Sequence, residues 1–114
     1  MMLSSTSFAE WTPVSYSTKG EIHYVDFERM REVDGFVYYW MVTDLLKPDK
    51  DGDLSYRAYF QADCKLFRHK WLQLSYHKEP MGKGRADDVT VAKEWTYPSP
   101  DSTKEEVLNT VCSR

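Results

Sequence analysis

The chain has 114 residues, a formal net charge of -3 and an aromatic content of 15%, and this length suits a single domain. A mildly acidic balance argues against a dedicated nucleic-acid binder, which normally carries a basic excess on one face. No apolar run approaches the roughly 18 to 20 residues of a membrane-spanning helix, so we expect neither a nucleic-acid partner nor a transmembrane segment.

Residues 1–9 carry no charge and become small and polar toward their end. Ser7 and Ala9 stand where a signal peptidase requires small side chains, which predicts the remnant of a secretion signal cleaved between Ala9 and Glu10. The alternative is a disordered tail, because a charged start and a full apolar segment are missing. In either case residues 10–114 are expected to form one domain.

The first part of that domain reads as short strands joined by turns. Strands are expected at Thr12–Ser17 and Glu21–Asp26, and Gly20 between them can adopt the positive φ of a tight turn. Phe27–Glu32 is expected to form one helical or irregular turn.

Asp34-Gly35 is the strongest hairpin signal in the chain, because a type I′ turn needs positive φ at both central positions. The strand that follows, Phe36–Thr43, is apolar or aromatic at nearly every position, as expected of a strand that is covered on both faces or lies at an oligomer contact. We expect it to be central to the sheet.

One helix can cover only one face of such a strand, and a large uncovered apolar patch is rare on soluble monomers. A two-fold homodimer is therefore expected to bury the second face. We choose Val37, Tyr39 and Met41 as the candidate dimer face; the alternative is the face of Tyr38 and Trp40.

A polar loop at Lys47–Asp53 should lead into a strand at Ser55–Cys64. Alternation places one set of its side chains, including Cys64, on the core face. That set is Tyr56, Ala58, Phe60, Ala62 and Cys64, whereas Arg57, Gln61 and Asp63 point the other way.

Leu66–His77 should continue the sheet, with Leu72, Leu74 and Tyr76 on one face and Trp71, Gln73, Ser75 and His77 on the other. A loop at Gly82–Gly84 precedes a last strand expected near Val89–Tyr97.

The final segment changes to a helical period. Ser102 followed by Glu105 is a capping-box pattern. The helix that follows places Val107, Leu108, Val111 and Cys112 on one face. The fold class is therefore expected to be α+β: a mainly antiparallel sheet with a short C-terminal helix packed on it.

The two cysteines, Cys64 and Cys112, lie on the buried faces of a strand and of a helix, so they are placed to meet between the two layers. In an exported protein this predicts a disulfide. The alternative is a pair of reduced core thiols in a cytosolic protein. No Cys-x-x-Cys motif suggests redox catalysis.

No metal site, cofactor or catalytic residue is expected. His23, His69 and His77 lack the paired spacing of zinc ligands. Aligning Gly52 with the glycine of an EF-hand puts Lys47 and Ala58 at ligand positions, so the acidic loop is a turn. No serine lies in a strand-turn-helix elbow, and Gly82-Lys83-Gly84 is not followed by a phosphate-binding helix start.

Basic residues gather in and after one predicted hairpin: Lys65, Arg68, His69, Lys70, Lys78, Lys83 and Arg85. Aromatic residues are interleaved with them, and mixed basic and aromatic surfaces are enriched at protein interfaces. We take Arg68, His69, Lys70 and Trp71 as the candidate binding face. The alternative is an ordinary solvated surface.

The ordered landmarks resemble those of the surface-adhesin protein E family of bacterial exported proteins. They are Trp11, Tyr24-Val25-Asp26, Trp40 after Asp34-Gly35, Asp63-Cys64, Tyr76, Trp95, Pro100-Asp101-Ser102 and Cys112. The resemblance implies a sheet with a C-terminal helix, a Cys64–Cys112 bridge, and a location in the periplasm or at the cell surface. The family's namesake is a host-attachment protein that binds extracellular-matrix and plasma proteins.

We therefore expect a non-enzymatic exported protein, periplasmic, on the outer surface or secreted, that binds a host extracellular or envelope protein. The alternative is a small periplasmic enzyme or enzyme accessory that acts on cell-envelope components. A cleft with converging ionisable groups would favour that alternative, and a flat aromatic sheet face would favour binding.

Overall fold

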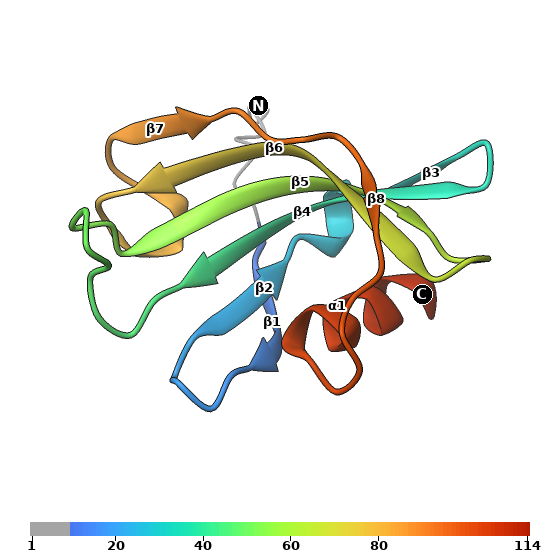
Figure 1. Ribbon diagram of the computed structural model, residues 1–114, viewed down its shortest axis with the longest axis horizontal. Helices are drawn as coiled ribbons and strands as arrows, with labels where there is room; N and C mark the ends of the chain where they lie inside the picture. Colours follow the sequence, from blue (N-terminus) through green and yellow to red (C-terminus); the bar gives the residue numbers. More distant parts are fainter. Residues whose placement is uncertain (1–9) are drawn as a thin grey trace, which may run out of the picture.

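The computed structural model describes residues 10–114, which form one antiparallel sheet of eight strands with a C-terminal helix beside it (Figure 1). The expected signal cleavage after Ala9 lies outside the described residues. The elements are β1 (Thr12–Tyr16), β2 (Ile22–Val25), η1 (Phe27–Arg29), β3 (Arg31–Val33), β4 (Phe36–Asp44), β5 (Ser55–Asp63), β6 (Arg68–His77), η2 (Pro80–Gly82), β7 (Ala86–Val89), β8 (Trp95–Thr96) and α1 (Thr103–Cys112).

The strands follow the order β1-β2-β4-β5-β6-β7, with β3 paired to β4 and β8 paired to β6. β2 and β3 lie end to end along one edge of β4, because β2 pairs with Met41–Asp44 and β3 with residues 36–38. Along the edge of β6, β7 and β8 are arranged in the same way. The expected α+β fold is confirmed, with β4, β5 and β6 as its longest and central strands.

The hairpin expected at Asp34-Gly35 joins β3 to β4. Both residues adopt positive φ, +53° and +86°, as a type I′ turn requires. The segment Phe27–Glu32 is only partly a helical turn, because η1 ends at Arg29 and Arg31 already pairs with Tyr38.

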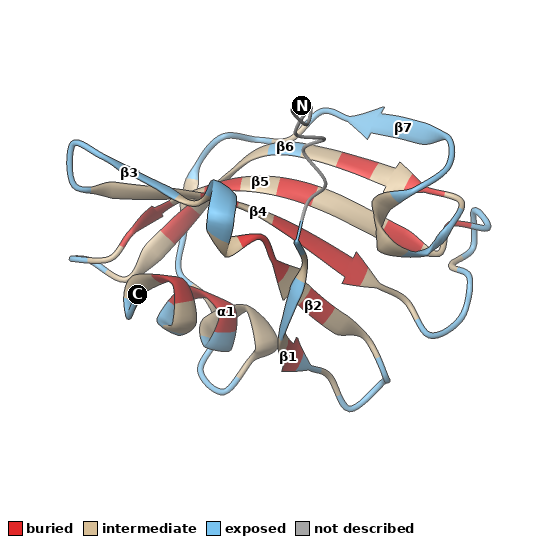
Figure 2. Ribbon diagram, turned by 180° about the vertical axis from the view of Figure 1, so that it is seen from behind, coloured by how far each residue is buried: buried red, intermediate tan, exposed pale blue. Residues whose placement is uncertain are grey.

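The core lies between the sheet and α1. Val107, Leu108 and Val111 on the helix belong to one buried cluster with Tyr39 and Phe60 on β4 and β5. Figure 2 shows these buried positions as bands across the central strands and along the sheet-facing side of the helix. We call the sheet surface beneath α1 the helix face.

The start of α1 is capped as its sequence indicates. The hydroxyl of Ser102 accepts a hydrogen bond from the Glu105 amide at 3.1 Å, which satisfies one orphan donor of the first turn. The carboxylate of Glu105 accepts from the Asp101 amide at 2.8 Å, one residue earlier than in a standard capping box. No helix in residues 10–114 is long and apolar enough to cross a membrane.

Two expectations for the second half of the sheet need correction. Val89–Tyr97 is not one strand, because residues 90–94 leave the edge of β6 between β7 and β8. A register shift between Tyr59 and Phe60, opposite Leu72, also changes the phase of β6. As a result Trp71 shares the helix face with Leu74 rather than lying opposite to it.

The disulfide between Cys64 and Cys112 is confirmed. Their Cα atoms lie 5.6 Å apart, 48 residues apart in sequence, within the usual range for a bridged pair. The bond joins the end of β5 to the last turn of α1, so it holds the C-terminal end of the helix against the sheet.

We predict that this bridge contributes about 4 kcal/mol to the free energy of unfolding, since closing a loop of this length restricts the unfolded chain. Urea unfolding of the oxidised protein and of the Cys64→Ser/Cys112→Ser double variant measures the difference. A difference below about 1 kcal/mol would show that packing of α1, not the bridge, holds the helix.

Candidate functional site

The sheet surface opposite the helix face carries a concentration of rings and cations. We call it the aromatic face, and its members come from five strands, β3, β4, β5, β6 and β8: Phe36, Tyr38, Trp40, Tyr59 and Trp95, with Arg31, Arg57, Arg68 and Lys70. Its aromatic residues are all partly exposed. Strict alternation along β4 and β5 separates these side chains from the core.

The centre of the aromatic face is a cross-strand group of three rings. Trp40 and Tyr59 are register partners on β4 and β5, and their ring centroids lie 4.6 Å apart in a tilted arrangement. Tyr38, two residues along β4, stacks diagonally on Tyr59 at 6.2 Å. Such neighbours on one face are the units that stabilise a sheet.

Guanidinium groups lie over both ends of this group. Arg57 is 5.5 Å from the centroid of Trp40, and Arg31 is 6.0 Å from that of Tyr38. Arg31 also donates a long hydrogen bond of 3.4 Å to the hydroxyl of Tyr59. Cation–π contacts of this kind hold the arginine side chains over the rings, where they remain accessible.

A second aromatic and basic group lies toward the turn that joins β5 and β6. Arg68 and Lys70 both approach the ring of Trp95 to 4.4 Å, from a strand that pairs with β8. Phe36 stacks on the same tryptophan at 5.7 Å. Arg68 also forms an ion pair of 3.0 Å with Asp63.

The candidate binding residues of β6 are therefore divided between two faces. Arg68 and Lys70 belong to the aromatic face, whereas His69 and Trp71 lie on the helix face, where they pack on Phe60. The reason is that successive side chains along a strand point to opposite faces of the sheet. Two of the four candidate residues therefore lie on a mixed basic and aromatic surface. The other members of that surface come from β3, β4, β5 and β8.

The candidate dimer face also needs correction. Tyr39 and Met41 are 1% and 0% exposed, because α1 packs on them within the monomer, and Val37 packs at the margin of the same cluster. These residues cannot contact a second copy while the core is intact. The alternative face, that of Tyr38 and Trp40, is the partly exposed one.

The acidic loop before β5 contains the single cluster of three or more metal-ligand side chains found in residues 10–114, formed by Asp49, Asp51 and Asp53. Asp49 is occupied by the loop's own amides, accepting from Asp51 at 3.0 Å and from Asp53 at 2.9 Å. The ammonium group of Lys78 lies 3.0 Å from the Asp53 carboxylate and donates to the Asp51 carbonyl at 2.7 Å. A lysine of the chain itself thus supplies positive charge to this loop.

The three histidines are buried. His23 hydrogen-bonds Thr43 at 2.6 Å and Thr103, at the start of α1, at 3.0 Å. Burial, with the nearby Lys104 charge, lowers the pKa of His23 and of His69 to about 4. Both rings are therefore neutral at pH 7 and lie on the helix face, away from the aromatic face.

Sequence reasoning missed Arg31, Arg57 and Tyr59 as members of one surface. Arg57 and Tyr59 alternate with the core residues of β5, and this signal was present in the sequence. Arg31 gave no such signal, because its place depends on the short β3 strand, which the pattern did not indicate.

The sequence profile of the family described as surface-adhesin protein E matches residues 11–113. Among curated protein sequences, none matches the chain. Solved structures of Haemophilus influenzae protein E share its fold. One crystal form gives a TM-score of 0.73 at 15% identity, covering 99% of this chain and 94% of that one. A selenomethionine form gives 0.71 at 16% identity, covering 100% and 95%.

We predict that stability falls as the pH is lowered from about 6.5 to about 4. In this range the unfolded chain protonates His23 and His69, whereas the folded state keeps them neutral. Unfolding should then take up about two additional protons at these two residues, and His77, whose pKa burial also lowers, adds to the uptake. Denaturant titrations across this pH range measure the slope.

The His69→Gln variant is the control for this pH dependence. Its unfolding should take up about one proton fewer than that of the wild type, because glutamine does not titrate, and the dependence of stability on pH should be correspondingly shallower. An identical slope for the variant and the wild type would contradict the assignment.

Proposed function

The chain belongs to the surface-adhesin protein E family, and from this membership we propose that it is an exported, non-enzymatic protein that binds a protein partner through its aromatic face. The partner is a host extracellular protein or a protein of the bacterial envelope. The location is the periplasm or the outer surface, where an oxidising environment maintains the Cys64–Cys112 bridge.

One observation carries the proposal: tryptophan, tyrosine and arginine are concentrated on the same partly exposed face. These three residue types are enriched among the residues that dominate binding energy at protein interfaces. Trp40, Tyr59 and Arg57 form contiguous contacts there. An uninterrupted patch of this composition fits the centre of an interface better than a solvated surface does.

The same contacts arrange the face before a partner arrives. The ring of Tyr59 is in contact with Trp40 and Tyr38, and Arg31 and Arg57 lie over this group. Side chains that are already ordered lose less conformational entropy on binding, which favours affinity.

Non-enzymatic function is supported by where the ionisable groups lie. His23 and His69 are buried beneath α1, and the aromatic face presents arginines, which stay protonated and are poor acid–base catalysts. Rings and guanidinium groups concentrated on a partly exposed face support binding over the alternative of an envelope-directed enzyme.

The proposal is tested by measuring binding of the purified domain, residues 10–114, to immobilised host matrix proteins, plasma proteins and envelope proteins. For any partner found, Trp40→Ala and Tyr59→Ala should each weaken binding by about 30-fold or more, the effect of losing an interface residue of high energetic weight. Circular dichroism and thermal unfolding establish that both variants keep the fold.

Tyr16→Ala is the matched control, because Tyr16 is 65% exposed on the distant edge strand β1. It should leave affinity within about twofold. Equal losses for Tyr16→Ala and Tyr59→Ala, or no loss for either face variant, would contradict the proposal.

A second copy of the chain is the other proposed occupant of this face. A two-fold axis would place the rings of Tyr38 and Trp40 against those of its partner. Sedimentation at micromolar concentration should show a dimer that Tyr59→Lys weakens. A monomer at every concentration would remove self-association and leave the face to other proteins.

A further inference from the structure

The edge of β6 is interrupted at its middle. β7 pairs with residues 74–77 and β8 pairs with His69 and Lys70, so residues 71–73 have no strand on that side. Residues 90–94 pass this position without a backbone hydrogen bond to residues 71–73. The backbone hydrogen bond found in this segment is internal and joins the Glu94 amide to the Ala92 carbonyl. Main-chain groups of β6 that point to this edge are therefore open to pairing.

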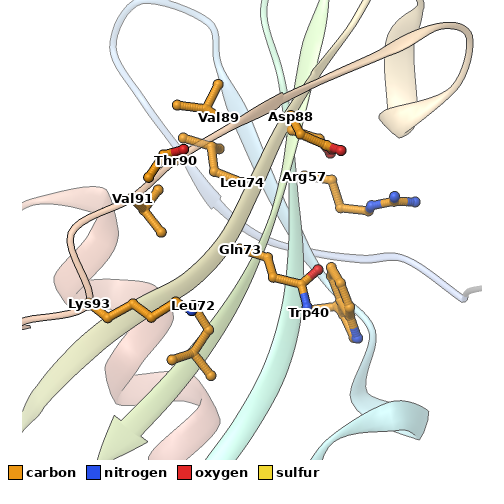
Figure 3. Close-up of a pocket in the computed structure, with 11 residues that line it drawn as sticks. Trp40, Arg57, Leu72, Gln73, Leu74, Asp88, Val89, Thr90, Val91 and Lys93 are labelled. Carbon is orange, nitrogen blue, oxygen red and sulfur yellow. The ribbon is translucent and has the colours of Figure 1, made fainter.

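A cleft of about 620 Å³ lies at the interruption, within the size range of ligand sites. Its two sides differ in chemistry. Leu74, Val89 and Val91 lie on one side of the β6 ribbon, and Trp40 and Arg57 lie on the other (Figure 3). Asp88 lies on the side of Arg57, and Lys93 lies on the side of the valines (Figure 3). The cleft thus has a largely apolar side and a polar side that carries Arg57, separated by an open strand edge.

Arg57 is the group in this cleft whose bonding is incomplete. Its Nε atom is buried and has no hydrogen-bond partner in the described part of the chain. Arg57 also forms none of the ion pairs found in residues 10–114. Lys93 adds a second positive charge to the lining, against the single carboxylate of Asp88. Because Nε is buried, an incoming carboxylate would pair with the terminal nitrogens of the guanidinium group.

We propose that this cleft binds a short extended segment of a partner protein that carries an acidic side chain between two apolar ones. The inference rests on the proposed protein-binding function and adds a location and a ligand chemistry to it. Main-chain groups of the segment pair with residues 71–73, and its carboxylate contacts Arg57.

The geometry of an extended chain favours this occupant over an acidic sugar. Successive side chains of a strand point to opposite faces, which matches a cleft with a largely apolar side and a polar side that carries Arg57. Pairing along a free strand edge is also a known mode of peptide recognition, in which main-chain bonds give affinity and side-chain pockets give specificity. A sugar would use Trp40 and Arg57 but not the unpaired edge or the valines.

The test uses two blocked pentapeptides, Thr-Val-Glu-Val-Thr and its isostere Thr-Val-Gln-Val-Thr, titrated into the isotopically labelled domain of residues 10–114. The acidic peptide should shift the amide signals of Leu72 and Gln73 and bind about tenfold more tightly than the amide isostere. Equal affinities, or unmoved signals at these two residues, would overturn the proposal.

Variants of the lining sharpen the test. Arg57→Gln should abolish the preference for the acidic peptide, and Arg57→Lys should retain part of it. Asp88→Asn should strengthen acidic-peptide binding about threefold, since it removes a like charge from the cleft. Asp87→Asn is its matched control, because Asp87 faces Arg85 and does not line the cleft, and it should change nothing.

N-acetylneuraminic acid and a hyaluronan tetrasaccharide are titrated in parallel. Tighter binding of either sugar than of the acidic peptide, at the same amides, would overturn the peptide assignment. Because the peptides are used without any natural partner, their binding succeeds or fails independently of the partner screen that tests the proposed function.

Discussion

A single helix of ten residues packs against one face of an eight-stranded sheet, and this packing organises the rest of the molecule. Val107, Leu108 and Val111 complete a core whose other half is supplied by β4 and β5. The bridge from Cys64 to Cys112 holds the last turn of the helix in place. Near its first turn, Thr103 hydrogen-bonds the buried ring of His23. Both ends of the helix are therefore fixed to the sheet.

The face opposite the helix has a different chemistry. Since alternate residues of a strand point to opposite faces, the same strands that bury Tyr39 and Phe60 present Trp40 and Tyr59 on the other surface. Arginines lie over these rings instead of a second helix. A surface of rings and guanidinium groups is stable in water and suited to protein contact.

The parts of the fold that depend on local rules could be predicted from the sequence. Asp34-Gly35 specified a hairpin, and the capping pattern at Ser102 specified the start of the helix. The faces of β5, including that of Cys64, followed from a period of two. The remaining features depend on tertiary pairing, which a single sequence does not display.

The bulge opposite Tyr59 and Phe60 is the clearest of these features, because one extra residue moved Trp71 to the helix face. The choice between the two faces of β4 was similar. Composition showed that both were apolar or aromatic, but only the position of α1 decided that Tyr39 would be buried and Tyr38 left accessible. Which face of β4 stays accessible thus depends on where the helix packs.

Covalent footprinting of tyrosine and tryptophan side chains, with and without a bound partner protein, tests the central claim most directly. The account predicts that labelling of Tyr38, Trp40 and Tyr59 falls on binding, while labelling of the exposed Tyr16 does not change. Unchanged labelling of the three rings in a saturated complex would contradict it.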